Sequence, residues 1–199
     1  MSHHIVCFML GGPGSGKSTL SKQMVEEMGF IHISLGKIIC GYVDDNPNEP
    51  DAIMFKEYIQ AGKCIPTDNA IEVIMKHTQE MYKDIDECLK VLIDGFPRAL
   101  EQLELFNKRS PMSFDNTNPN MYIIHLDTPK ELMKERIYGR HRNDIDRDEN
   151  VTDSRIEYFY SETMQVIDKI SEEIPKQIIT INGTDEIEDK IKLLKSLLG

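Results

Sequence analysis

One short stretch of this chain carries residue types that can hold a chain of phosphates. Residues 11–19 read GGPGSGKST and follow the apolar run IVCFML at 5–10. Glycines let backbone N–H groups turn inward around phosphate oxygens, and a helix that begins there presents its positive end. The spacing fits G-x-x-x-x-G-K-[ST], in which the lysine reaches the terminal phosphates and the serine hydroxyl reaches Mg²⁺. We therefore expect ATP to contact Gly14, Ser15, Gly16, Lys17, Ser18 and Thr19.

A second stretch, VLIDGFPRALEQ at 91–102, supplies an acid, an arginine and a glutamine. Asp94 ends an apolar run, so its carboxylate is expected beside the phosphate loop, where it could orient a Mg²⁺-bound water. Arg98 emerges from a Gly-Phe-Pro turn, and its guanidinium has the fork geometry that suits phosphate oxygens. Gln102 follows four residues later, and its amide could pair with a base edge. The alternatives are a helix-capping aspartate and a solvated helix face.

The elements that must position these residues alternate between apolar runs and amphipathic segments. This alternation predicts an α/β fold, with a parallel sheet covered by helices. The expected strands are Ile5–Leu10, Phe30–Ile33, Lys90–Asp94, Met121–Leu126 and Gln177–Ile181. Apolar residues at helical spacing predict helices over Gly16–Met28, Pro129–Gly139, Thr152–Glu173 and Glu186–Leu198. Residues 34–89 are expected to form a helical insertion that is interrupted by a loop at 44–51.

Composition limits the class of protein. The chain has 199 residues, which suits one domain, and a formal charge of −11 argues against a broad basic surface for nucleic acid. The four cysteines are scattered, which favours thiols over a disulfide framework or a zinc ribbon. No run has the length of a membrane span and no signal peptide is apparent, so we expect a cytoplasmic protein without a membrane partner.

The pairing of GGPGSGKST with DGFPR resembles the nucleoside monophosphate kinases, and among them the short-lid adenylate kinases and the UMP–CMP kinases. The resemblance runs from about Ile5 to the carboxyl terminus. It implies a P-loop fold with a five-stranded parallel sheet, an acceptor-binding insertion at about 34–66 and a lid at about 140–151. The remaining core would span 1–33, 67–139 and 152–199. Mg²⁺ and ATP would meet a nucleoside monophosphate in one domain of a monomer.

The resemblance also assigns roles to individual positions. Arg136 would stack on the donor adenine, Arg140 would touch phosphate, and Gly183 would meet the adenine through its backbone. Phosphoryl transfer would rest on Lys17, Arg98, Arg140, Arg142 and Arg155. The monophosphate would be bound by Ser34, Leu35, Lys37, Lys63, Cys64, Ile65, Gly95, Phe96, Pro97, Arg98, Gln102, Arg142 and Arg155. Ser18, and Asp94 through water, would hold Mg²⁺.

Two departures from the family pattern affect these expectations. Cys40 stands where an arginine usually grips the acceptor phosphate, and Lys37 stands where an acidic residue is usual. Loss of a hydrogen bond to a charged group predicts roughly ten- to hundredfold weaker acceptor binding. We hypothesise that the Lys37 ammonium replaces the missing charge; the alternative is a lysine that points to solvent. The lid lacks a four-ligand zinc pattern, so no zinc is expected, and Arg142 is favoured over Arg147 as its phosphate ligand.

The acceptor base is less firmly indicated. Gln102 matches the glutamine by which adenylate kinases read adenine, whereas UMP–CMP kinases tend to carry asparagine there. Leu35 differs from the threonine of the former and from the alanine of the latter. We therefore expect AMP, with UMP or CMP as the alternative. A second alternative is a nucleotide-binding regulatory protein that has lost transfer through Cys40.

Overall fold

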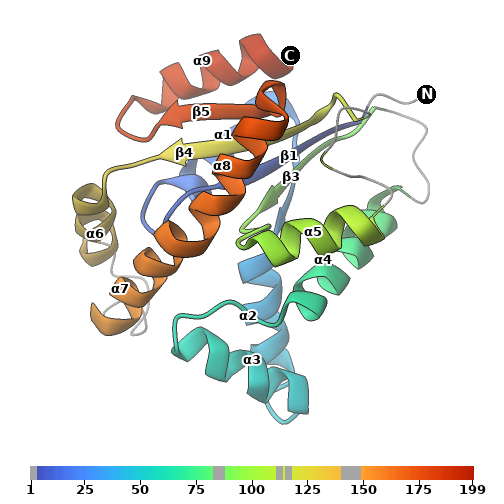
Figure 1. Ribbon diagram of the computed structural model, residues 1–199, viewed down its shortest axis with the longest axis vertical. Coiled ribbons are helices and arrows are strands. Elements are labelled where there is room, and N and C mark those ends of the chain that lie inside the picture. Colours follow the sequence, from blue (N-terminus) through green and yellow to red (C-terminus); the bar gives the residue numbers. More distant parts are fainter. Residues whose placement is uncertain (1–3, 83–87, 111–113, 115–117, 140–148) are drawn as a thin grey trace.

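The sheet of this protein is parallel throughout. The computed structural model describes residues 4–82, 88–110, 114, 118–139 and 149–199. Its strands are β1 (Ile5–Leu10), β2 (Ile31–Ser34), β3 (Lys90–Asp94), β4 (Met121–Asp127) and β5 (Ile178–Asn182). They are arranged in the order β2-β3-β1-β4-β5, and every neighbouring pair is parallel (Figure 1). All the carboxyl ends therefore meet at one edge, which is where such sheets bind ligands.

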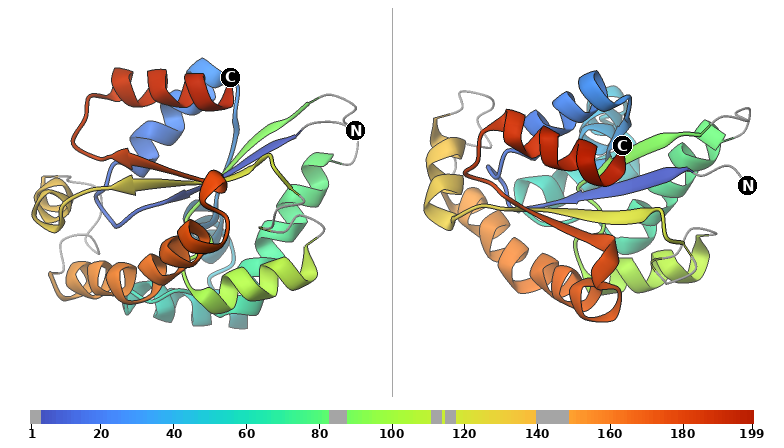
Figure 2. Two further views of the ribbon diagram at one scale, coloured as in Figure 1. Left: turned by 45° about the horizontal axis from the view of Figure 1, so that its top comes forward. Right: turned by 90° about the horizontal axis from the view of Figure 1, so that it is seen from above.

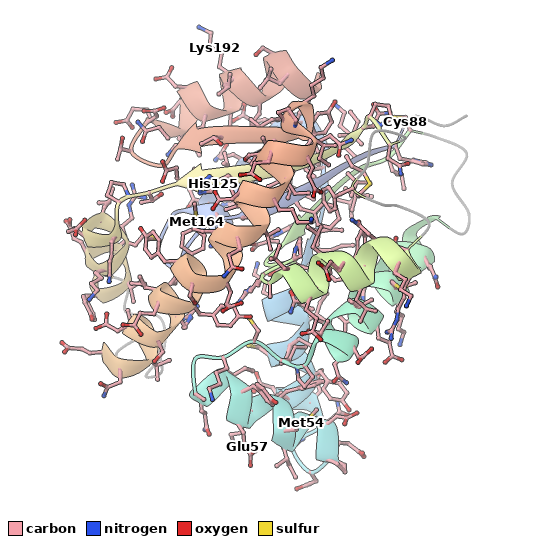
Figure 3. All side chains as sticks on the ribbon, in the orientation of Figure 1. Met54, Glu57, Cys88, His125, Met164 and Lys192 are labelled. Atoms are coloured by element: carbon pink, nitrogen blue, oxygen red, sulfur yellow. The ribbon has the colours of Figure 1, made fainter. Side chains whose placement is uncertain are left out.

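Helices cover both faces of this sheet. Around the chain they are α1 (Lys17–Met28), α2 (Leu35–Asp45), α3 (Pro50–Gln60), α4 (Thr67–Tyr82), α5 (Leu100–Arg109), α6 (Lys130–Tyr138), α7 (Glu149–Tyr158), α8 (Met164–Glu173) and α9 (Ile187–Leu198). Helices α1 and α9 lie over one face, and α4, α5 and α8 lie over the other (Figure 2). Helices α2 and α3 extend from the body at the end opposite α9, as the labelled Met54 and Glu57 of α3 and Lys192 of α9 show (Figure 3).

Alternation along the strands divides the core into two layers. Cys7 and Met9 of β1 pack with Met24 of α1 and Leu194 of α9 on one face. On the other face, Phe8 packs against the aromatic rings of the α5 side, including Phe106 at a centroid distance of 5.6 Å. Because both faces are buried, the strands are apolar along their length rather than alternating, which is what made them visible in the sequence.

The predicted strands all exist, but several bounds were wrong by one residue. The second strand runs Ile31–Ser34 and not Phe30–Ile33, and the fifth begins at Ile178 and not at Gln177, which belongs to a short 3-10 turn, η3 (Pro175–Gln177). The loop expected at 44–51 is narrower, because α2 continues through Asp45 and α3 begins at Pro50. A proline is favoured in the first turn of a helix, where its missing N–H has no partner to lose.

The helix expected over Thr152–Glu173 differs most from its prediction. It begins earlier, at Glu149, and it is interrupted by a π-helical turn, η2 (Phe159–Thr163), that separates α7 from α8. At its end the Met164 N–H bonds to the Phe159 carbonyl, five residues back. Such turns insert a residue into an α-helix and recur at functional sites. In the described part of the chain, no helix is long and apolar enough to cross a membrane.

Candidate active site

A pocket opens at the carboxyl edge of the sheet, where β1 and β3 end. It is bounded by the phosphate loop, by the turn after β3, by the turn after α3, and by α7 with η2. The lining residues are Met9, Leu10, Gly11, Pro13, Lys17, Gly62, Cys64, Gly95, Arg98, Arg155, Tyr158, Phe159 and Thr163. Its charged members are Lys17, Arg98 and Arg155, so a locally basic pocket lies within a chain of net charge −11. That charge suits a polyanion.

The phosphate loop is organised by its own backbone. The Lys17 ammonium donates to the carbonyl oxygens of Gly11 at 2.7 Å and Gly12 at 2.8 Å. Gly16 precedes α1 at a φ of 103°, a conformation that favours glycine. The loop and the helix N-terminus therefore form together, as the local sequence predicts.

Arg136 connects the phosphate loop to the turn after β5. Its guanidinium donates to the Ser15 carbonyl oxygen at 3.1 Å and to the Gly183 carbonyl oxygen at 3.2 Å. Gly183 packs so closely on β4 that an added Cβ would lie 1.8 Å from the Thr128 hydroxyl. Lys190 of α9, which the sequence analysis did not single out, also donates to the Gly183 carbonyl oxygen, at 3.0 Å. The two segments expected around the donor adenine are thus brought together.

Arg98 is held by its own turn, by the start of α5 and by η2, of which only η2 is distant in sequence. Its Nε donates to the Gly95 carbonyl oxygen at 2.9 Å, and its backbone N–H donates to Gln102 Oε1 at 2.8 Å. Its own carbonyl oxygen accepts from the Thr163 hydroxyl of η2 at 2.9 Å. Nη1 lies 3.9 Å from Cys64 Sγ. With Nε and the backbone engaged, the guanidinium is oriented toward the pocket it lines.

Gln102 was expected one turn after Arg98 on a shared helix face, but α5 begins only at Leu100. The Gln102 amide oxygen instead accepts from the Arg98 backbone N–H before the helix begins, and the residue is 2% exposed. Because the Arg98 N–H requires an oxygen, the orientation of the amide is fixed, and its NH₂ end is left to face another group.

Asp94 lies at the end of β3 beside His32 of β2. His32 Nε2 is 3.9 Å from Asp94 Oδ2, and burial lowers the pKa of His32 in spite of that carboxylate. Within the described residues, the buried Asp94 Oδ1 has no hydrogen-bond partner. A buried carboxylate oxygen of this kind can be satisfied by water or by a hard cation. The described residues contain no group of three or more His, Cys, Asp or Glu that could hold a metal ion.

The turn after α3 meets α7 closely at Gly62. An added Cβ there would lie 3.1 Å from the Val151 carbonyl oxygen and 3.3 Å from Arg155 Cγ. Gly62 also has a φ of 68°, so both its conformation and its contact favour glycine. This approach brings Arg155 to the same pocket as Arg98.

The two departures, Lys37 and Cys40, are both exposed on α2. Burial of part of the Cys40 side chain, followed by the nearby Asp44 carboxylate, raises the pKa of its thiol, while the Arg155 charge acts in the opposite direction. Lys37 acts electrostatically on His32.

The remaining predicted residues fall into two groups. Ser34 and Leu35 lie where β2 passes into α2; Lys63, Cys64 and Ile65 follow α3; and Phe96 and Pro97 form a cis peptide in the turn before Arg98. Arg140, Arg142 and Arg147 lie outside the described residues.

Sequence reasoning missed Tyr158 and Thr163, which line the pocket. Tyr158 is three residues beyond Arg155 and could have been found on the same helix face, whereas Thr163 was hidden by the π-helical turn.

Comparison with known proteins adds family information to this geometry. A family model described as "Adenylate kinase" matches residues 9–174. The UMP-CMP kinase of Homo sapiens is 29% identical over 191 residues, covering 94% of this chain and 94% of that protein. UMP-CMP kinase 3 of Arabidopsis thaliana is 29% identical over 194 residues, covering 98% and 89%. The UMP-CMP kinase of Prunus armeniaca is 30% identical over 188 residues, covering 94% and 76%.

Proposed function

Because the chain belongs to the adenylate kinase family, we propose that its phosphoryl acceptor is AMP and that the reaction is ATP + AMP = 2 ADP. The chain is a nucleoside monophosphate kinase that transfers a phosphoryl group from ATP. The observation that supports the choice of AMP is the buried Gln102 amide, whose oxygen accepts at 2.8 Å from the backbone N–H of Arg98, a residue that lines the pocket. A glutamine amide can pair with the amino group and a ring nitrogen of adenine at once.

The proposed roles of the other residues follow from where they lie. Lys17 and the phosphate loop bind the β- and γ-phosphates of ATP, with Ser18 and Thr19 at the start of α1, and Arg136 and Gly183 bind the adenine. Arg98, from the turn after β3, and Arg155, from α7, bind the transferred phosphoryl group and the acceptor phosphate in the pocket that both residues line. The proposed acceptor insertion is 34–66 and the proposed lid is 140–151, which would add Arg140 and Arg142.

Phosphoryl transfer needs little covalent participation from the protein, since positioning and charge neutralisation provide most of the acceleration. Lys17, Arg98 and Arg155 supply positive charge around a shared pocket. Ser18 and Asp94 offer the oxygen ligands that Mg²⁺ prefers, Asp94 through a water that its unpartnered Oδ1 can accept from. When bound, Mg²⁺ would neutralise charge on the phosphate oxygens.

A second candidate acceptor is UMP or CMP. It is favoured by the names of the relatives above, all of which are UMP-CMP kinases. Cytosine also presents a ring nitrogen beside an amino group, so the Gln102 amide could serve it as well. The length of the side chain at position 102 separates the two candidate acceptors, because the UMP–CMP kinases tend to have asparagine there, which is shorter than glutamine.

The acceptor is tested by initial rates with Mg²⁺·ATP and AMP, CMP, UMP, dCMP or GMP, measured on the unchanged chain and on Gln102→Asn. AMP is expected to give the highest kcat/KM, and Gln102→Asn should lower it for AMP by roughly tenfold, as loss of one to two hydrogen bonds predicts. A higher kcat/KM for CMP or UMP in the unchanged chain would overturn AMP in favour of the second candidate. Binding of ATP without turnover of any acceptor would indicate that transfer was lost with the arginine that Cys40 replaces.

A further inference from the structure

Lys190 of α9 is a buried cation that the mechanism above does not use. The residue is 8% exposed, and its ammonium donates to the Gly183 carbonyl oxygen at 3.0 Å. The Arg136 guanidinium donates to the same oxygen at 3.2 Å. Two positively charged side chains, one from α9 and one from α6, therefore share a single neutral acceptor in the turn after β5.

Three physical effects oppose a charge at this position. Lysine is seldom buried without a paired anion, and in the part of the chain that the structure describes no carboxylate forms an ion pair with Lys190 or Arg136. Lys190 also lies in the first turn of α9, at the positive end of the helix. Burial, followed by the charge of Arg136, lowers the pKa of Lys190, while Asp185 and Glu186 act in the opposite direction. A buried cation that opposes stability in this way points to a role in function.

The Gly183 turn that Lys190 contacts is joined to the phosphate loop by two side chains. Arg136 donates to the Ser15 carbonyl oxygen at 3.1 Å as well as to Gly183. Thr128, which follows β4, donates its hydroxyl to the same Ser15 oxygen at 3.2 Å, and Gly183 packs directly on this side chain. The position of Gly183 therefore bears on both contacts to the phosphate loop.

Lys190 holds the side of Gly183 that the sheet does not hold. The Gly183 N–H donates to the Asp127 carbonyl oxygen, which attaches the turn to β4. The carbonyl oxygen of Gly183 is fixed only by the two cations among the described residues. Loss of the Lys190 hydrogen bond would leave Arg136 alone to orient that carbonyl group.

We propose that Lys190 is a positioning residue for the donor nucleotide, whose ammonium orients the Gly183 carbonyl group so that Arg136 can join the turn after β5 to the phosphate loop. The inference rests on the proposed function, which places ATP against the phosphate loop, Arg136 and Gly183. It does not depend on which nucleoside monophosphate is the acceptor.

Lys190→Met tests this role, because methionine is a long unbranched side chain without the ammonium. The affinity for Mg²⁺·ATP, measured by calorimetry without an acceptor, should fall by roughly three- to tenfold, the range for one lost hydrogen bond. The KM for ATP should rise by a similar factor, whereas the acceptor KM and kcat at saturating ATP should not change. The denaturation midpoint of the ligand-free protein should not fall, because the substitution removes a buried charge.

Lys192→Met is the matched control, because Lys192 lies on the same helix but is exposed (Figure 3). It should leave the affinity for ATP unchanged. An unchanged affinity in Lys190→Met, or an equal loss for ATP and for the acceptor, would overturn the proposal. Because ATP binding is measured without an acceptor, a chain that prefers CMP would contradict the proposed reaction and still decide the role of Lys190.

A double variant tests whether Lys190 acts through Arg136. Residues that work through one network have effects that do not add. Arg136→Met combined with Lys190→Met should therefore bind ATP about as weakly as Arg136→Met alone. Full additivity of the two losses would show that Lys190 acts independently of Arg136, which would contradict the proposed route.

Discussion

The donor and acceptor sides of the pocket are built in different ways. On the donor side, Lys17 bonds to carbonyl oxygens five and six residues away, within one continuous loop. On the acceptor side, Arg98 is held by Thr163, 65 residues away, and lies near Cys64, 34 residues away. The phosphate loop is thus local and can be read from a motif, although the adenine end of the donor side depends on Arg136 reaching Ser15 and Gly183. The position of Arg98 depends in addition on elements that are distant in sequence. Variants of the phosphate loop should therefore lose activity with every acceptor, whereas variants around Arg98 should mainly affect the kinetic constants for the acceptor.

The largest effect is expected at Lys17, on the local side. Lys17→Ala removes the ammonium that would neutralise charge on the transferred phosphoryl group, so kcat/KM should fall by roughly 100- to 1000-fold with every acceptor. Steady-state kinetics with ATP as the varied substrate measures this. A rise confined to the acceptor KM would contradict the assignment of Lys17 to the donor side.

Arg98→Lys should have the next largest effect. Lysine keeps the charge but lacks the planar fork, because its three N–H groups all leave one nitrogen, so it cannot donate to the Gly95 carbonyl oxygen and also present two parallel N–H groups from separate nitrogens to phosphate. We expect a roughly ten- to hundredfold loss of kcat/KM for the acceptor with little change in ATP binding. The matched control is Arg109→Lys, because Arg109 pairs with exposed Asp68 on the surface at 2.7 Å. Equal losses in the two variants would contradict a specific role for the Arg98 fork.

Variants of Lys37 and Cys40 on α2 test which positive charge binds the acceptor phosphate. If Lys37 replaces the missing arginine, Lys37→Ala should raise the acceptor KM by roughly tenfold, and Cys40→Arg in that background should restore it. Arg155 lines the same pocket as Arg98 and offers a second source of charge. An unchanged KM in Lys37→Ala would therefore reject the Lys37 hypothesis and leave Arg155 as the compensating cation.

Thr163→Val tests the long-range support of Arg98 at nearly constant side-chain volume. It removes the hydroxyl that donates to the Arg98 carbonyl oxygen, so kcat/KM for the acceptor should fall by roughly two- to fivefold. The ATP KM should not change, which a general loss of structure would not achieve. Comparison of acceptor and donor titrations on the same preparation makes the distinction.

The smallest effect is on the stability of the fold and involves two histidines of the sheet, His32 of β2 and His125 of β4. Burial lowers the pKa of His32 and of His125, whose ordinary value is 6.5. Below that value the unfolded chain takes up protons that the native state resists, so the free energy of unfolding should fall as the pH drops from about 7 to about 5.5. His125 is labelled on β4 in Figure 3. The variant His125→Gln should reduce the dependence of the free energy of unfolding on pH, as measured by denaturant titrations at several pH values. An unaltered slope would mean that His125 does not contribute.

The same contrast explains how far the sequence could be interpreted. Apolar runs predicted each strand, because a sheet buried on both faces needs them, and the phosphate loop was complete in its motif. Arg98 and Gln102 were singled out by their motif, but the hydrogen bond between the Arg98 N–H and the Gln102 amide oxygen was not predicted, since it depends on where α5 begins. Thr163 could not be placed, because its contact to Arg98 crosses the fold and helical spacing fails at η2, whereas Tyr158 follows Arg155 on α7 and could have been found.

The π-helical turn η2 contains one residue more than a continuous α-helix would need. Removal of one residue from Phe159–Thr163 would allow α7 and α8 to join as one continuous α-helix. Each residue turns an α-helix by about 100°, but the wider π-helical turn takes up its extra residue, so Arg155 and Tyr158 would keep their direction relative to the buried Val166 and Ile170. The loss would fall on the turn itself, where the Thr163 hydroxyl donates to the Arg98 carbonyl oxygen. A single deletion here should therefore leave a folded protein in which Arg98 has lost its contact to η2.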